Sequence, residues 1–282
     1  MDSEDNLGST QRNSKIQTLT NVVKAAIGIG MLSLPYAFRQ AGLVVGTVGC
    51  LLSGILTTYC MLQVVVAHNI VAKGRFLNYS EVAQEAFRLS KFPWVRKCSK
   101  VAGVITNVMI VITQLGLCTV FILYCSKTMK DLSDTYVPTW ELKVAYWHIA
   151  ITIVLIPYCF ITSLHRLSYF MHLANAGTIV CVVIIFQYVI RNVQPLDNID
   201  LVTTPADFFS FFGTAMFAFA STSSVLPVRN AMKTPKSFDG TIGVLSIGMA
   251  IVCLLYTSTG ILGYLCFGRD SIVITRNLPD HW

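Results

Sequence analysis

The chain has 282 residues, of which 54% are hydrophobic and only 12% are charged, whereas a typical soluble domain has about 25% charged residues. This composition, with a mean hydropathy of +0.62, excludes an ordinary soluble domain. The net charge of +7 comes from basic residues divided among short loops, so we interpret it as a membrane-topology signal and exclude a nucleic-acid partner.

Residues 1–15 are polar and lack the apolar core of a signal peptide, so we expect a disordered cytosolic tail. An apolar first stretch, 18–38, is followed by six charge-free stretches. Each can hold a spanning helix of about 20 residues, and the one that begins at 173 is completed by the uncharged residues before it. These stretches are 40–67, 101–126, 144–164, 173–190, 208–228 and 240–268. The sequence therefore predicts an all-α membrane protein with about seven transmembrane helices.

The expected organisation follows from these stretches. Helices one to five occupy 16–190, an outer loop 191–206, helices six and seven 207–268, and an outer segment 269–282. Thirteen lysines and arginines fall on the N-terminal side of the membrane in this scheme and seven on the other. Because basic residues concentrate on the cytosolic side, the N-terminus is predicted to be cytosolic.

The first stretch is too short for a simple span. Between Lys24 and Arg39 it has fourteen uncharged residues, which rise about 21 Å as a helix, against the roughly 30 Å of a bilayer core. Gly28 and Gly30 lower helix propensity there, and Pro35 removes a backbone donor. We therefore expect two half-helices, with unwound backbone lining a cavity between them.

A second interruption is expected in helix six. Ser221 to Ser224 are four consecutive hydroxyl residues after Phe219, and Pro227 follows. Hydroxyl side chains compete for backbone hydrogen bonds, although in membranes they also simply let helices pack closely. A matched pair of interrupted spans is the sequence sign of an inverted-repeat transporter.

The two interruptions suggest the chemistry of the solute. A half-helix that begins after Gly30 points its positive end and free amides into the site, which suits a carboxylate. The carbonyls left free where helix six opens, near Ala220 to Ser223, suit an ammonium group. Together they fit a zwitterion, and amino acids are the commonest such solute. The predicted substrate-binding residues are Gly28, Ile29, Gly30, Met31, Phe219, Ala220, Ser221, Thr222 and Ser223.

No enzyme chemistry is indicated. Seven cysteines lie in apolar runs without metal-ligand spacing, so we interpret them as small core residues and expect neither metal nor cofactor. Neither paired carboxylates nor a metal-ligand cluster lies within the membrane stretches. His68 is expected to be a solvated residue at a span end, and the following loop is expected to hold a surface helix with Val82, Ala86 and Phe87 on one face.

Five sets of segments carry a family resemblance: GIGMLSLPYAFRQAG, VITQLGLCTVFI, LANAGTIVCVVIIFQYVIRN, FFGTAMFAF with VLP and NAMK, and LGYLCFG with ITRNLP. Together they resemble the amino acid/auxin permease group, most closely its proton-coupled amino acid transporters. The resemblance implies a five-plus-five inverted-repeat fold, small neutral amino acids as substrates, the proton as a second partner, and a lysosomal, vesicular or plasma membrane.

The chain departs from the group at three places. The resemblance implies a coupling histidine in helix one and glutamates in and after helix six, where this chain has Asn21, Ala220 and Arg229. Because proton transport needs an ionisable group, coupling by the usual residues is not expected. The group has about eleven spans, so we expect the chain to be a fragment or a truncated form.

Three other functions remain open at this stage. An amino acid sensor or an inactive partner of the same fold would also explain Asn21, Ala220 and the missing spans. A seven-span receptor matches the helix count but normally has its N-terminus outside. A membrane enzyme would need polar groups that the sequence does not provide.

Overall fold

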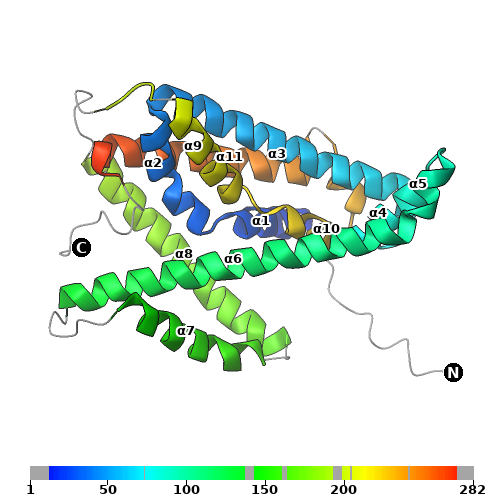
Figure 1. Cartoon of the computed structure of the whole chain (residues 1–282), viewed down its shortest axis with the longest axis horizontal. Coiled ribbons are helices and arrows are strands. Elements are labelled where there is room, and N and C mark those ends of the chain that lie inside the picture. The colour runs from blue at the N-terminus through cyan, green and yellow to red at the C-terminus, as the bar shows by residue number, and fades with distance from the viewer. Residues whose placement is uncertain are drawn as a thin grey trace. The chain divides into compact units, whose positions relative to one another are not determined.

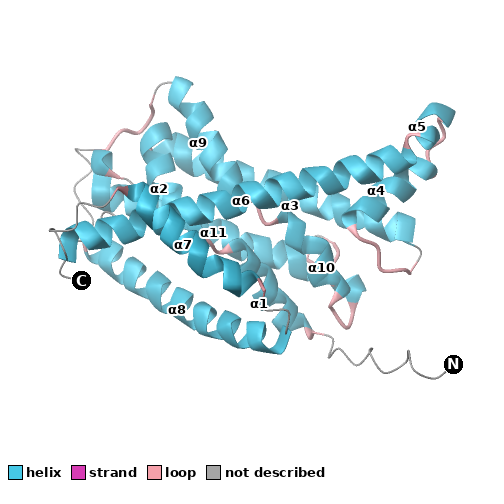
Figure 2. Ribbon diagram, turned by 60° about the horizontal axis from the view of Figure 1, so that its bottom comes forward, coloured by secondary structure: helices cyan, strands magenta, loops and turns pink. Residues whose placement is uncertain are grey.

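The computed structural model describes residues 13–72, 74–136, 143–160, 164–192, 199–203, 205–240 and 242–271. Within these ranges every regular element is a helix (Figure 2). This confirms the prediction of an all-α protein. Most of the predicted tail, residues 1–12, lies outside the described residues.

The helices are labelled in Figure 1. They are α1 (Lys15–Ala26), α2 (Ile29–Ala41), α3 (Leu43–Ala72), α4 (Tyr79–Arg88), α5 (Pro93–Lys97), α6 (Ser99–Tyr136), α7 (Val144–Cys159), α8 (Leu164–Arg191), α9 (Pro205–Ala218), α10 (Val225–Asn230) and α11 (Val244–Phe267). Short 3₁₀ turns cover Thr222–Ser224, Pro235–Ser237 and Gly268–Asp270.

Four helices in the described ranges are long and apolar enough to cross a membrane: Leu43–Ala72, Ser99–Tyr136, Asp207–Asn230 and Val244–Phe267. The pair α1 and α2 passes as a fifth span, bent where the two helices meet. Two shorter apolar helices, Val144–Pro157 and Ala176–Arg191, coincide with the other two predicted stretches. The structure therefore supports a multi-pass membrane protein, and the count of seven stays a prediction.

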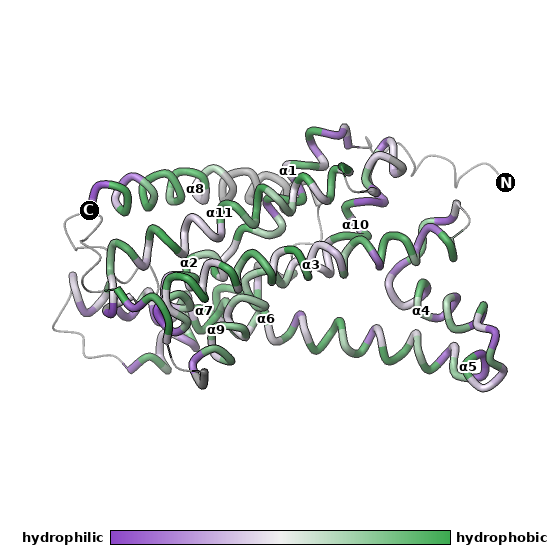
Figure 3. The backbone as a smooth tube through the Cα atoms, turned by 90° about the horizontal axis from the view of Figure 1, so that it is seen from above, coloured by the Kyte–Doolittle hydropathy of each residue, from purple (hydrophilic) through white to green (hydrophobic). Residues whose placement is uncertain are grey.

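The helices have the hydropathy of membrane spans. Figure 3 shows hydrophobic residues along α3, α6 and α11, with hydrophilic residues near α5. None of the apolar window of α6 is buried, and Leu115 on it is 64% exposed. Side chains of this kind suit lipid, because hydrocarbon tails are as apolar as leucine.

Contacts divide the chain into two compact units. Unit 1 comprises Met1–Ile27, Leu51–Ile110 and Phe219–Leu255, and unit 2 comprises Gly28–Cys50, Val111–Ala218 and Tyr256–Trp282. Several long helices contribute to both units, so each unit is described by itself.

In unit 1, α1 packs beside α10. The backbone of Asn13 donates to the Ala231 carbonyl at 2.9 Å and accepts from the Lys233 amide at 3.0 Å. Ser14 then begins α1 with a capping box, in which its hydroxyl and the Gln17 side chain each bond the other's backbone. The start of α1 is thus fastened by main-chain bonds to the segment that follows α10.

In unit 2, α2 packs along α9, and Phe38 lies at the centre. Its side chain is 0% exposed, and its ring meets that of Phe211 edge-on, with centroids 6.3 Å apart. Gly46 and Gly260 leave room for the ring, because a Cβ at Gly260 would lie 2.3 Å from a ring carbon of Phe38. Glycines thus let a large aromatic side chain fit between closely packed helices.

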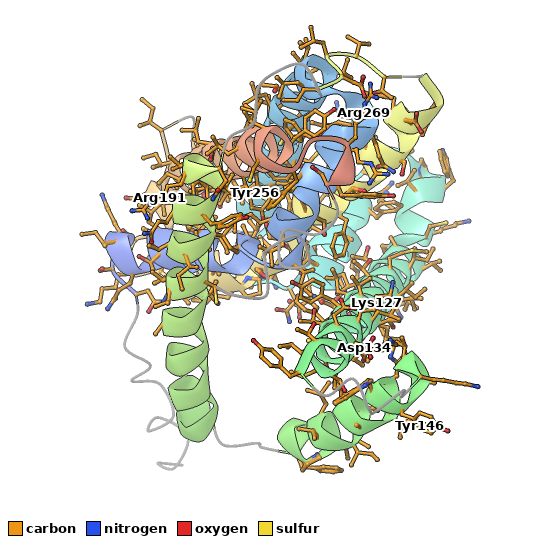
Figure 4. The ribbon with its side chains drawn as sticks, turned by 90° about the vertical axis from the view of Figure 1, so that its left-hand side faces the viewer. Lys127, Asp134, Tyr146, Arg191, Tyr256 and Arg269 are labelled. Carbon is orange, nitrogen blue, oxygen red and sulfur yellow. The ribbon has the colours of Figure 1, made fainter. Side chains whose placement is uncertain are left out.

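The end of the predicted outer loop lies beside Gly42 in unit 2. Gly42 joins α2 to α3 with a φ of +82°, a conformation that glycine adopts readily. The carbonyl of Asp200 accepts from Leu43 N at 2.9 Å, in the first turn of α3. Two hydrogen bonds join its carboxylate to Arg269, at 2.8 and 3.0 Å (Figure 4). Arg269 lowers the pKa of Asp200, so this pair stays charged down to mildly acidic pH.

The cysteines only partly match the expectation of core residues. Cys50 and Cys266 are buried, but Cys60, Cys118 and Cys181 are exposed on apolar helix surfaces. Those three were wrongly predicted to be core, because an apolar run does not distinguish a protein-facing from a lipid-facing position. None of the cysteines whose state the structure describes forms a disulfide.

Candidate functional site

The first break is the interruption at Ile27 and Gly28, between α1 and α2. Ile27 ends α1 with an extended backbone, and Gly28 precedes α2 with φ −159° and ψ −163°. Glycine has no side chain that could cap the helix, and no side-chain cap is formed. The amides at the start of α2, those of Ile29 and Gly30, therefore point out of a helix N-terminus, a geometry that favours an anion.

Gly30 is also a point of close packing within unit 2. A Cβ built there would lie 2.4 Å from the Cα of Ala218, the last residue of α9. The obstacle is backbone, which cannot rotate away. The backbones of α2 and α9 thus approach at a distance that only glycine allows at this position.

The second break is the interruption at Phe219–Ser224, between α9 and α10. Phe219 to Ser221 are not helical, and Thr222–Ser224 forms a 3₁₀ turn before α10 begins at Val225. The final carbonyl of α9, on Ala218, accepts from the buried Tyr256 hydroxyl at 3.2 Å (Tyr256 is labelled in Figure 4). The interruption predicted from the serine and threonine run is therefore observed.

Most carbonyls at the second break already have donors. The Phe219 carbonyl accepts from Ser221 N at 2.7 Å, and the Ser221 carbonyl from Ser224 N at 3.1 Å. The Thr222 carbonyl accepts both Val225 N and the Tyr79 hydroxyl. Among the residues that the structure describes, none donates to the carbonyl of Ala220. The expectation of several free carbonyls was too broad, and Ala220 is the one we retain.

A narrow pocket of unit 1 lies beside the second break, with a cavity volume of about 10 Å³, enough for about one water molecule. Ser221 and Ser224 contribute hydroxyl groups to its wall, and the remaining side chains are apolar. They are Val22, Ala25, Met61, Val225, Val228, Leu245 and Met249.

The predicted site residues fall into two groups. Gly28, Ile29, Gly30 and Met31 lie at the first break in unit 2, and Phe219, Ala220, Ser221, Thr222 and Ser223 lie at the second break in unit 1. Met31 and Phe219 are 2% and 1% exposed, so neither side chain is open to a solute in this structure. Asn21 lies on α1, next to the pocket residue Val22.

The expectation that His68 is solvated is wrong. It is 2% exposed, its Nε2 accepts from Leu77 N at 3.3 Å, and its Nδ1 lies 3.2 Å from Nη1 of Arg229. Arg229 also donates to Asn69 and forms an ion pair with Asp239, with Nε and Oδ1 3.3 Å apart. Arg229 is only 6% exposed, so its buried charge is balanced and hydrogen-bonded.

Tyr79 is the other residue that sequence reasoning missed. It begins α4, where Asn78 N donates to the Glu81 carboxylate at 2.8 Å and fixes the first turn. Its hydroxyl donates to the Thr222 carbonyl and accepts from Leu226 N at 3.3 Å. Burial raises the pKa of Tyr79, so the donor proton is retained. Of the apolar face predicted for α4, only Val82 is buried, while Phe87 is 40% exposed.

Comparison with known proteins finds a family and two relatives that match this chain over most of its length. The profile of the family described as "Transmembrane amino acid transporter protein" matches residues 11–282. The chain is 30% identical over 278 residues to the "Proton-coupled amino acid transporter-like protein pathetic" of Drosophila melanogaster, covering 94% of this chain and 57% of that protein. It is 26% identical over 284 residues to "Amino acid transporter AVT3C" of Arabidopsis thaliana, covering 94% of this chain and 63% of that protein.

No solved structure matches the chain. The chain spans about 57–63% of the length of these two curated relatives. The family description and both names refer to transporters and not to enzymes.

Proposed function

Because the chain belongs to the transmembrane amino acid transporter family, we propose that it moves small neutral amino acids across a membrane as a secondary transporter. The observation that carries this proposal is the pair of breaks, which interrupt two otherwise apolar spans. Unwound backbone at membrane depth is tolerated where it lines a cavity, and in transporters it lines the substrate site.

In this proposal the amides of Ile29 and Gly30, at the first break in unit 2, are the groups that bind the substrate carboxylate. The carbonyl of Ala220, at the second break in unit 1, is the group that binds the substrate ammonium.

The proposal includes the expected architecture and location. We assign the chain about seven transmembrane helices, with the inverted-repeat arrangement that the two broken helices favour, and a cytosolic N-terminus. The membrane would be lysosomal, vesicular or plasma membrane, and transport would not be coupled to protons through the usual residues.

Uptake of radiolabelled alanine tests this function. In liposomes or cells that contain the chain, we expect saturable uptake that is competed by other small neutral amino acids and does not vary with external pH. An amino acid sensor is the second candidate, favoured by Asn21, Ala220 and Arg229 in place of the ionisable residues that the resemblance implies. Saturable alanine binding without any uptake would contradict transport and favour the sensor.

Replacing Ala220 with glutamate should introduce pH dependence. Ala220 is half-buried at the second break, and a carboxyl placed there would supply the ionisable group that proton uptake and release require. We expect Ala220→Glu to take up alanine several-fold faster at pH ~5 than at pH ~8, because the protonated form keeps the break uncharged. Initial rates in a pH series measure this.

The matched control is Ala220→Gln, which has nearly the same shape but does not titrate. It should keep the flat profile of the unmodified chain. A flat profile for Ala220→Glu, with uptake retained, would count against Ala220 as the position that decides coupling.

A further inference from the structure

Tyr79 is not part of either interrupted span, yet its hydroxyl bonds peptide groups at the start of the 3₁₀ turn Thr222–Ser224 and in the first turn of α10. It donates to the Thr222 carbonyl and accepts from the Leu226 amide, using its one proton and one of its two lone pairs. All of these residues belong to unit 1. A single side chain from the connection between α3 and α6 thus joins the beginning and end of the turn.

The first turn of α10 depends on the hydrogen bond from the Leu226 amide to the Tyr79 hydroxyl. Ser224 precedes the helix but forms no side-chain cap. Val225 N donates to the Thr222 carbonyl, Pro227 has no amide proton, and Leu226 N finds its partner only in Tyr79 among the described residues. The tyrosine therefore does for α10 what an N-cap serine or threonine does for other helices.

The opposite end of α10 is held by the end of α3. Arg229 contacts His68 and Asn69 there, and Asp239 joins them through a 2.5 Å hydrogen bond from Asn69 Nδ2. Leu77, two residues before Tyr79, donates its backbone N–H to the same His68. The cluster that holds the end of α10 therefore also holds the chain just before Tyr79.

We infer that Tyr79 is a positioning residue, which fixes the unwound backbone of the second break and so sets where the Ala220 carbonyl points. This deepens the proposed function, because the Ala220 carbonyl is the group assigned to the substrate ammonium. Tyr79 touches no substrate itself and acts through the backbone of Thr222 and Leu226. Without the hydroxyl, the turn would sample several conformations, and the ammonium site would be formed only part of the time.

The test is Tyr79→Phe, which removes the hydroxyl and keeps the ring. Loss of one hydrogen bond of ordinary strength corresponds to about a fivefold change in an equilibrium constant. We expect hydrogen–deuterium exchange at the Leu226 amide to accelerate about fivefold. For alanine uptake we expect KM to rise by about the same factor with Vmax retained, since the site forms less often but transports normally once formed.

Substrate discrimination supplies a readout that general destabilisation would not change. N-methylalanine differs from alanine only at the ammonium group, so the preference for alanine should fall in Tyr79→Phe. The matched control is Tyr146→Phe, since Tyr146 lies on α7 with 59% of its surface exposed (Figure 4). Tyr146→Phe should leave three quantities unchanged: the exchange rate of the Leu226 amide, the KM for alanine uptake, and the preference for alanine over N-methylalanine.

The outcomes separate this inference from the proposed function. Unchanged exchange at Leu226 in Tyr79→Phe overturns the inference whether or not the chain transports. Two results would overturn the positioning role and leave Tyr79 with a structural role only. One is faster exchange with a Vmax that falls by as much as KM rises. The other is faster exchange with an unchanged preference for alanine over N-methylalanine. If the unmodified chain takes up no alanine, the proposed function fails, and accelerated exchange still supports Tyr79 as the residue that fixes the break.

Discussion

Replacing Gly30 with alanine is expected to abolish amino acid uptake. The new Cβ would lie 2.4 Å from the Cα of Ala218 and 3.0 Å from its Cβ, well inside van der Waals contact. Since the obstacle is the backbone of α9, α2 must shift as a whole. That shift would displace the amides at the start of α2. We expect initial uptake rates to fall at least about tenfold, equivalent to about 1.4 kcal/mol in the transport barrier.

The control for Gly30→Ala is Gly213→Ala on α9. A Cβ at Gly213 meets no atom within 4 Å, so this variant makes the same chemical change without a clash. It should transport normally, and both variants should reach the membrane in equal amount, as measured by surface labelling. Gly30→Leu makes the same test more severe. Normal uptake by Gly30→Leu would contradict the assignment of the first break as a substrate site.

Replacing Phe38 with alanine should cause the largest loss of stability. Within a bilayer the hydrophobic transfer term is small, so the cost comes from lost packing around the cavity. Removing about 100 Å³ of side chain at ~24 cal/mol per Å³ costs about 2.4 kcal/mol. Gly46 and Gly260 bring helix backbones against the ring, and backbones cannot collapse into the space. The expected fall in melting temperature is about 5–10 °C.

Thermal unfolding of purified protein in detergent, followed by the loss of helical circular dichroism, measures this effect. Phe209→Ala is the control, because Phe209 lies on α9 with 77% of its surface exposed. It removes the same atoms from a position without a packed environment, so its melting temperature should change little. Equal melting temperatures for the two variants would contradict the central place of Phe38 in unit 2.

The two breaks could be predicted because their causes are local. Glycine at Gly28 weakens the helix and cannot cap the next one, and the hydroxyl run before Pro227 offers the backbone other partners. Both effects act within a few residues, so they are legible in a short window of sequence. The same holds for α4, whose capping residues Asn78 and Glu81 stand three apart.

The contacts around the second break could not be predicted in this way. Tyr79 reaches Leu226 across 147 positions, and Arg229 reaches His68 across 161. Periodicity in an apolar helix does not show which side faces protein and which faces lipid, so the exposed cysteines were placed in the core. The number of free carbonyls was overestimated because tight local turns supply amide donors from Ser221, Ser224 and Val225, and one further donor, Tyr79, comes from a distant segment.

The main-chain bonds between Asn13 and the residues after α10 have a mechanical consequence. Because the bonding atoms belong to the peptide backbone, these bonds do not depend on the identity of the side chains, except that proline at position 13 or 233 would remove a donating N–H. The start of α1 and the segment after α10 are therefore expected to stay joined through most substitutions at these positions.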